Sequence, residues 1–254
     1  MSELDKILTA VLEKVTPSPL ERERVNAAVE KVMKALREAS ASLSARADVE
    51  IEGSFAKDTW LSGDVDVDIF LLFDPALSLE ELRAEGLAVS RMAAQLLGVE
   101  WIERYASHPY LTLKLGVCDV DVVPAYKVRD ASQIVSPVDR TPFHTQYVKR
   151  RLDERPAMRN EVRLLKRFAK GVGVYGAEIK VEGFSGYLTE LLVIHYGSFL
   201  EVLRSASSWR PYRVAIDVEG HYPNARSIFE RFRDPLVVVD PVDPKRNVAS
   251  PVSL

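Results

Sequence analysis

The chain has almost no cysteine, few histidines and no long run of apolar residues. Its single cysteine, Cys118, excludes an internal disulfide, and one cysteine with four histidines does not supply a zinc ligand set. No apolar stretch approaches the roughly 20 residues of a membrane span, and the N-terminus lacks the features of a signal peptide. The sequence therefore predicts a cytoplasmic protein with no membrane partner, in which Cys118 is inert core.

The net charge is only −3, but it is distributed unevenly. Residues 1–128 contain 14 Lys and Arg against 22 Asp and Glu, whereas residues 129–254 contain 20 against 15. An acidic half that can hold cations thus precedes a basic half that can hold phosphates. The alternative explanation is that charged surface residues are distributed unevenly without a functional reason.

Two apolar segments carry aspartates at alternate positions. Residues 65–73 (VDVDIFLLF) include Asp66 and Asp68, and residues 118–124 (CDVDVVP) include Asp119 and Asp121. In a strand, residues i and i+2 face the same side, roughly 6.6 Å apart along the backbone. Carboxylates in such a setting must be paired or bound to a metal to offset their desolvation.

Three carboxylates from two neighbouring strands can hold two Mg²⁺ ions about 3.5–4 Å apart, which is the arrangement of nucleotidyl transfer. Magnesium prefers hard oxygen ligands and keeps waters and substrate phosphates in its shell. The predicted ligands are Asp66, Asp68 and Asp121, and Asp119 is the reserve choice. The alternative for Asp119 is an edge-strand charge or a structural bond.

A Gly-Ser turn precedes the first pair of aspartates. Glycine lets the backbone approach a phosphate closely, and the next residues can open a helix whose N–H groups attract anions. Ser54 adds a hydroxyl and Lys57 adds a cation. A Gly-Ser pair at this distance before Asp-Val-Asp predicts a phosphate-binding turn, although Lys57 alone is also compatible with a solvated surface residue.

Apolar periodicity and breakers predict an α+β chain. Ser18 is expected to cap a helix that begins at Pro19, and Pro124 is expected to end the sheet because proline cannot donate to a ladder. We expect helices at residues 4–15, 19–44, 79–97, 161–172 and 186–206, with another beginning at 141. We expect strands at residues 48–52, 65–73, 100–105, 110–115, 118–123 and 236–240. The pattern changes from strands to helices near residues 136–140, so the predicted domains are 1–136 and 137–254.

The predicted helix at residues 161–172 carries one basic stripe. Arg163, Lys166, Arg167 and Lys170 recur at spacings of three and four residues. Such a stripe is usually a solvated face. Because it follows a metal site that needs triphosphate partners, we interpret Lys166 as a phosphate contact.

Taken together, these residues resemble the archaeal (class I) CCA-adding enzymes, the tRNA nucleotidyltransferases of the polymerase-beta superfamily. The resemblance covers nearly the whole chain and includes GSFAKDTWLSGDVDVDIFLLF, YASHPYLTL, VDVVPAYKV, VDRTPFHTQYV, EVRLLKRF, GVYGAE, GFSGYL and VDPVDPKRNVA. It implies a nucleotidyltransferase head with a mixed sheet and flanking helices, joined to a mainly helical neck. The implied activity is template-independent addition of C, C and A to the tRNA 3′ end (the acceptor stem), with CTP and ATP as substrates and Mg²⁺ as cofactor.

The resemblance also assigns roles by matching motif. Asp66, Asp68 and Asp121 match the metal-binding carboxylates, and Ser54 and Lys57 match triphosphate contacts of the head. The residues that match neck-side contacts to nucleotide phosphates and sugar are Thr141, His144, Lys166, Tyr175 and Ser185. Arg246 matches the arginine that reads the base edge together with the RNA backbone, a task that suits its fixed fork of donors.

Two alternatives remain on the sequence alone: another polymerase-beta-type transferase acting on RNA or a small acceptor, and a nucleotide- or RNA-binding module without catalysis. Family members continue into body and tail domains, whereas this chain stops after Ser250-Pro251-Val252-Ser253-Leu254 with no closing helix. We therefore expect either a truncated form or a minimal enzyme with another way of holding RNA.

Overall fold

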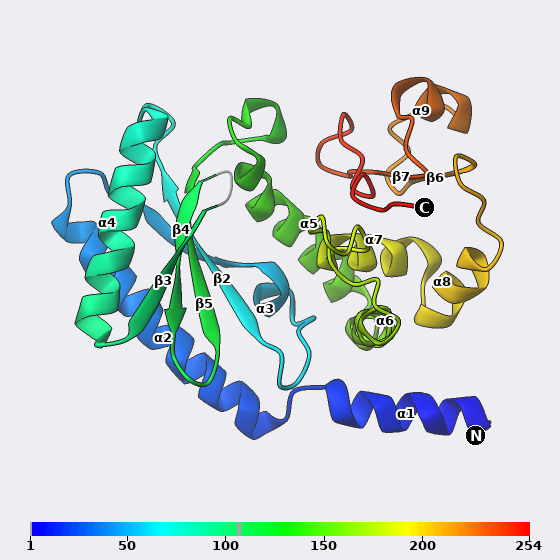
Figure 1. Cartoon of the computed structure of the whole chain (residues 1–254), viewed down its shortest axis with the longest axis horizontal. Coiled ribbons are helices and arrows are strands. Elements are labelled where there is room, and N and C mark those ends of the chain that lie inside the picture. The colour runs from blue at the N-terminus through cyan, green and yellow to red at the C-terminus, as the bar shows by residue number, and fades with distance from the viewer. Residues whose placement is uncertain (1, 106–107) are drawn as a thin grey trace. The chain divides into compact units, whose positions relative to one another are not determined.

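The computed structural model describes residues 2–105 and 108–254, and contacts between residues divide the chain into two units. We call Pro17–Thr145 the sheet unit, and Met1–Thr16 together with Gln146–Leu254 the helical unit. Figure 1 shows the elements of both. The contact-based units have other bounds than the predicted domains, residues 1–136 and 137–254, which remain a prediction.

A mixed five-stranded sheet with the order β1-β2-β5-β4-β3 forms the sheet unit. β2 and β5 run parallel, and the other neighbours run antiparallel. The strands are β1 (Asp48–Glu52), β2 (Asp66–Phe73), β3 (Glu100–Tyr105), β4 (Pro109–Lys114) and β5 (Asp119–Tyr126).

Two helices, α2 (Pro19–Ser42) and α4 (Leu79–Leu97), pack on one face of this sheet and form its main core with it (Figure 1). As predicted, Ser18 caps α2: its hydroxyl accepts a hydrogen bond from the Glu21 N–H at 3.1 Å. The remaining short elements are α3 (Gly53–Lys57) and the 3₁₀ turns η1 (Ala131–Gln133) and η2 (Pro137–Arg140). Cys118 is buried in the same core, as predicted, and burial raises its pKa to about 11.

The prediction that Pro124 ends the sheet is wrong. β5 continues through Pro124, which lies opposite Leu71 of β2, to Tyr126. The β4 side of β5 is already unpaired there, because β4 pairs only as far as Val122. Pro124 therefore forfeits no ladder hydrogen bond on that side. Its ring packs against α4 at Gly86, where a Cβ would lie 2.5 Å from the Pro124 Cβ.

The helical unit is mainly α-helical, as predicted, and α1 packs against α6 within it. Its small parallel sheet pairs β6 with β7. The bounds are α1 (Glu3–Val15), α5 (Thr141–Glu154, which begins in the sheet unit), α6 (Met158–Gly171), α7 (Gly186–Tyr196), α8 (Phe199–Ala206), β6 (Val214–Asp217), α9 (Ala225–Arg231) and β7 (Leu236–Val239).

A single helix over residues 186–206 was expected, and that prediction is wrong. The segment forms two helices, because Gly197 adopts φ 91° and ends α7. Ser198 then caps α8, its side chain accepting from the Glu201 N–H at 3.2 Å. A glycine in the left-handed conformation followed by a capping serine is a stop and start signal that outweighed continuous apolar periodicity. β6 and α9 were not predicted.

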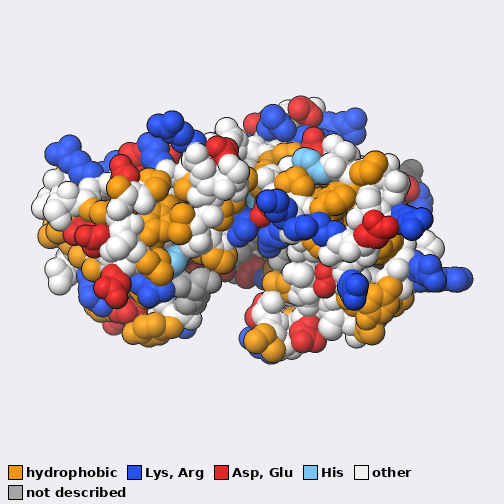
Figure 2. Space-filling view, turned by 90° about the horizontal axis from the view of Figure 1, so that it is seen from above, with side chains coloured by type: hydrophobic (Ala, Val, Ile, Leu, Met, Phe, Trp, Pro, Cys, Tyr) orange, Lys and Arg blue, Asp and Glu red, His pale blue; other side chains and the backbone are white. Residues whose placement is uncertain are grey.

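Within the described residues, none of the helices combines the length and the apolar character that a bilayer crossing requires. On the face drawn in Figure 2, basic and acidic side chains occur over both units. On that face, the charge difference between the two halves of the sequence therefore does not produce a surface patch of only one charge sign.

Candidate active site

β2 and β5 place the predicted metal ligands at neighbouring register positions. Asp68 lies opposite Asp121 in the parallel pair, and Asp66 lies opposite Asp119. Neighbouring strands are about 4.8 Å apart, so the backbones of Asp68 and Asp121 stand within reach of a shared cation. Because the strands alternate faces, all four aspartates belong to one face of the sheet.

The other face of the same strands is core, which explains why the aspartates face away from it. Val67 and Ile69 are fully buried under α2 and α4. Asp66 is exposed, while Asp68 and Asp121 are half-buried. The Asp-Val-Asp pattern thus buries its valine and leaves its carboxylates on the side that these two helices do not cover.

Asp121 is held from the β4 side. Its Oδ1 accepts a hydrogen bond from the Thr112 hydroxyl at 2.6 Å. Burial raises the pKa of the Asp121 carboxyl, the Thr112 bond opposes this rise, and the negative charge of Asp66 adds to it. Burial and the charge of Asp121 also raise the pKa of Tyr110 on β4. The acidic side chains are therefore close enough to disfavour one another's charge.

Asp119 differs from Asp121, because it forms an ion pair with Lys114 of β4. This is the structural bond that the sequence left open for Asp119. Among residues 2–105 and 108–254, no three acidic, histidine or cysteine side chains converge closely enough in this structure to bind one metal ion. The backbone register nevertheless brings the aspartates to neighbouring positions on one face of the sheet.

Gly53 lies directly beside Asp68. Its φ is +67°, and a Cβ at this position would lie 1.8 Å from Asp68 Oδ2. Any other residue would be strained in that conformation and would also displace the carboxylate. The Gly-Ser turn is therefore fixed against the aspartate of β2, as its place in the sequence predicted.

A buried carboxyl supports this turn from β1. Glu52 lies opposite Asp68 in the β1–β2 pair and is only 3% exposed. Burial raises the pKa of Glu52 to about 7, and its hydrogen bond with the Thr145 side chain opposes the rise. Thr145 Oγ1 also accepts the Gly53 N–H at 3.3 Å. Glu52 and Thr145 together position the turn, and the sequence did not single out either.

The predicted triphosphate contacts of the head follow the turn. Ser54 is half-buried and Lys57 is buried at the end of α3. α3 has five residues, so the expected helix N-terminus is a single turn with little dipole of its own. The solvated-surface alternative for Lys57 is wrong, because its side chain is 6% exposed.

Thr141 and His144 lie in the first turn of α5. Contacts place them in the sheet unit, next to the Thr145 that holds Gly53. The matched motif described them as neck-side residues, whereas the structure groups them with the Gly-Ser turn. The same-face spacing of Thr141 and Thr145 was the available signal for the role of Thr145.

In the helical unit, Lys166 of α6 is buried rather than solvated. Lys166 and Glu190 of α7 are 2% and 0% exposed, and Lys166 Nζ lies 3.6 Å from Glu190 Oε1. Arg163 on the same helix is 2% exposed. The usual interpretation of a basic stripe as a solvated face is therefore wrong for these two residues. The spacing of the basic residues gave no sign of Glu190 as their neighbour.

Three predicted contacts of the helical unit meet at the start of α7. A Cβ on Gly186 would lie 3.0 Å from Tyr175 Oη and 3.8 Å from Lys166 Nζ. Ser185 immediately precedes Gly186 and caps α7, accepting from the Leu188 N–H at 3.1 Å. Lys166, Tyr175 and Ser185 thus surround one helix N-terminus, which is suited to anions.

Arg246 belongs to a second polar cluster of this unit. Its Nη1 donates to Asp240 Oδ2 at 2.9 Å, and Asp240 is fully buried. The Tyr187 hydroxyl donates to Asp240 Oδ1 at 3.1 Å, and burial together with the Asp240 charge raises the pKa of Tyr187. The guanidinium is therefore oriented by a buried carboxylate and remains partly exposed, with 36% of its side chain accessible.

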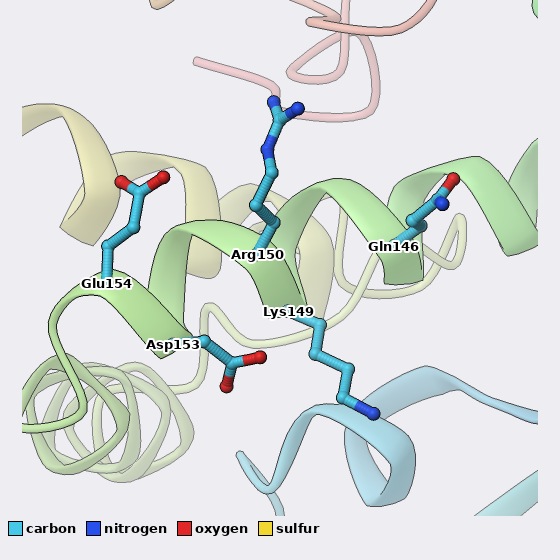
Figure 3. Close-up of a pocket in the computed structure, with 5 residues that line it drawn as sticks. All are labelled: Gln146, Lys149, Arg150, Asp153 and Glu154. Carbon is cyan, nitrogen blue, oxygen red and sulfur yellow. The ribbon is translucent and has the colours of Figure 1, made fainter.

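A cavity of about 500 Å³ also lies along α5, lined by residues that the sequence did not select. Its lining comes from a single helix, and Arg150 and Lys149 extend in different directions from it (Figure 3). Because these side chains diverge, the cavity does not define a site. The full lining is Gln146, Lys149, Arg150, Asp153 and Glu154.

Known domains match both parts of the chain. Residues 29–144 match the model of the nucleotidyltransferase domain, and residues 160–254 match the model of the second domain of tRNA nucleotidyltransferase. Solved structures with this fold include the Cid1 poly(U) polymerase bound to MgGTP, with a TM-score of 0.74, 16% identity, and coverage of 99% of this chain and 89% of that one. A cytoplasmic RNA terminal U-transferase has a TM-score of 0.72 and 16% identity over 98% of this chain and 86% of its own. Residues 29–144 thus form a nucleotidyltransferase domain, and these solved structures share the fold of the chain.

Relatives identified by sequence specify the kind of nucleotidyltransferase that the chain is similar to. The CCA-adding enzyme of Halorubrum lacusprofundi is 45% identical over 253 residues, which are 100% of this chain and 52% of that enzyme. The CCA-adding enzyme of Pyrobaculum neutrophilum is 45% identical over 100% of this chain and 58% of its own length. The chain belongs to the family of tRNA nucleotidyltransferases that includes these archaeal enzymes, as the resemblance implied. It spans about half the length of the curated relatives that it matches.

Proposed function

We propose that this chain carries out template-independent addition of C, C and A to the 3′ end of tRNA, using CTP and ATP. The observation that carries the proposal is the β2–β5 register, which sets Asp68 opposite Asp121 beside the Gly53 turn. Family membership and 45% identity to two CCA-adding enzymes support the choice of reaction.

The donor set fits a hard divalent cation. Carboxylate oxygens on one face are the ligands that Mg²⁺ prefers, and the raised pKa of Asp121, caused by burial and neighbouring acidic charge, supports the proposal. Asp66, Asp68 and Asp121 would hold two ions, which when bound lower the pKa of an attacking hydroxyl and stabilise the leaving pyrophosphate.

The chain's other residues bind and orient the substrates in this proposal. Ser54, Lys57, Thr141 and His144 contact the nucleotide from the sheet unit. Lys166, Tyr175 and Ser185 supply phosphate and sugar contacts at the start of α7, where two of them adjoin Gly186. Arg246, oriented by Asp240, reads the base edge with the RNA backbone.

A gel-resolved extension assay tests the proposal. tRNA lacking its 3′ end is incubated with Mg²⁺ and CTP alone, ATP alone, or both. We expect two C additions with CTP alone and no addition with ATP alone. With both nucleotides we expect C, C and A in that order. The Asp68→Asn variant, which keeps the shape of the side chain, serves as the inactive control.

Other outcomes decide between the alternatives. Unordered tails of A or U would instead indicate a general RNA nucleotidyltransferase, the class of the solved structures that share this fold. Nucleotide binding without release of pyrophosphate would indicate a non-catalytic module. Cytoplasmic location is part of the proposal and rests on the tRNA substrate.

A further inference from the structure

An unusual turn precedes β6 in the helical unit. The Arg213 N–H donates to the Arg210 carbonyl at 3.1 Å, which closes a four-residue turn with Pro211 second and Tyr212 third. Tyr212 has φ +62°, the conformation for which this kind of turn normally selects glycine. A bulky aromatic residue there is a genuine outlier, and such strain persists where the surroundings fix it. Here the Tyr212 N–H is tied to the Pro235 carbonyl at 2.8 Å.

The turn presents Tyr212 at the rim of a cavity. The tyrosine is 52% exposed, although nothing in the turn requires an aromatic side chain. The cavity has a volume of about 600 Å³ and combines aromatic rings with guanidinium groups. Its lining residues are Tyr212, Arg213, Phe229, Phe232, Arg233 and Asp234.

The charges of this cavity are available to an external anion. Arg213 and Arg233 are exposed, and neither guanidinium has an ion-pair or hydrogen-bond partner within the part of the chain that the structure describes. Asp234, the acidic member of the lining, accepts a hydrogen bond from the Asn247 side chain at 2.9 Å. The cavity therefore has a surplus of unpaired positive charge beside its rings.

Phe232 forms the floor rather than the rim. It is 8% exposed and meets Tyr222 edge to face, with ring centroids 6.2 Å apart. Phe229 is half-buried against the same small core. The rigid floor and the fixed turn give a preformed aromatic surface, so binding there would cost little conformational entropy.

We propose that this cavity is a docking site for a single-stranded RNA segment, with a base stacked on Tyr212 and backbone phosphates contacting Arg213 and Arg233. Aromatic platforms flanked by arginines are the means by which proteins hold unpaired RNA, because every base offers a π face and every nucleotide a charge. A purely apolar partner would leave both guanidinium groups without a counter-charge.

The site is distinct from the cluster that contains Arg246. Because β6 and β7 are parallel, the cavity lies at the start of both strands, whereas Asp240 and Arg246 follow the end of β7. The proposed site goes beyond the proposed transfer reaction, because none of its lining residues takes part in that reaction as proposed.

The test is fluorescence anisotropy with a labelled single-stranded RNA, measured without nucleotide or Mg²⁺ over a range of salt concentrations. We expect Tyr212→Gly to weaken binding roughly tenfold, the loss of one stacked base. Its melting temperature should stay equal or rise, because glycine suits the turn. Tyr212→Phe, which keeps the ring, should bind as the unmodified protein does.

Two arginine variants supply an independent measurement. Arg213→Ala and Arg233→Ala should each reduce the slope of log affinity against log salt by about 0.7, the value of one phosphate contact to a single strand. Arg204→Ala, an exposed arginine on α8, is the matched control and should leave the slope unchanged.

Unchanged RNA affinity in Tyr212→Gly together with unchanged salt slopes would overturn the proposal and leave a protein partner as the occupant to seek. A preference for duplex over single-stranded RNA would overturn it as well. The extension assay with Asp68→Asn does not use these residues, so failure here and failure of the proposed reaction are separable.

Discussion

The two units solve opposite electrostatic problems. In the sheet unit, Asp66, Asp68 and Asp121 share one face, and the negative charge of Asp66 raises the pKa of Asp121. In the helical unit, Lys166 and Arg246 already have carboxylate partners, Glu190 and Asp240, both fully buried. The comparison teaches that the sheet unit gathers like charges on one face, whereas the helical unit pairs buried carboxylates with cations and so orients them.

The largest expected effect concerns the aspartate face of the sheet unit. Asp68→Asn should reduce nucleotidyl transfer by several orders of magnitude, because it removes a metal ligand. Thermal stability should be unchanged or higher, since a like charge is also removed. Single-turnover extension and a melting curve check the two results. Asp119→Asn is the matched control on the same face and should retain activity, because Asp119 is paired with Lys114.

The next effect concerns the buried Lys166–Glu190 ion pair of the helical unit. Lys166→Met should lower the free energy of unfolding by about 3–5 kcal/mol, because it removes a cationic partner of the fully buried Glu190. Replacing both residues, Lys166→Met with Glu190→Leu, should restore most of the loss. Urea unfolding measures both, with exposed Lys180→Met as the control. If single and double variants lost equal stability, the pair would not be coupled.

Arg246 sharpens the comparison, because its charge serves orientation rather than chelation. Arg246→Ala should alter the ratio of kcat/KM for CTP to that for ATP roughly tenfold, the value of one lost hydrogen bond to a charged group. Magnesium dependence should not change. An equal decrease for both nucleotides would argue that Arg246 does not read the base.

The smallest effect concerns His108, which is buried in the sheet unit near Arg83. Burial and the Arg83 charge lower the pKa of His108 below its usual 6.5, so the folded protein favours the neutral ring. Below pH 6.5 the unfolded chain therefore takes up a proton that the folded chain resists, and stability falls as the pH falls. His108→Phe should lose this component. Unfolding free energies at pH 5.5 and 7.5 give the difference, and identical slopes in both proteins would contradict it.

Much of the sheet unit could be predicted from its sequence, because its signals are local. The Asp-Val-Asp alternation predicted the shared face, and Gly-Ser predicted a turn that excludes a Cβ beside Asp68. The predictions that failed depend on tertiary contacts between segments far apart in the sequence. That Pro124 continues β5 depends on where β4 stops pairing, and that Lys166 is buried depends on Glu190 of another helix. The apolar periodicity of a single segment does not reveal either neighbour.

The helical unit is also assembled from segments that are far apart in the chain. α1 packs against α6, and the whole sheet unit lies between them in sequence. During synthesis, the apolar side of α1, which includes Leu8, Val11 and Leu12, must wait for roughly 145 further residues before its partner emerges. The sheet unit would thus be synthesised in full before α1 can pack against α6.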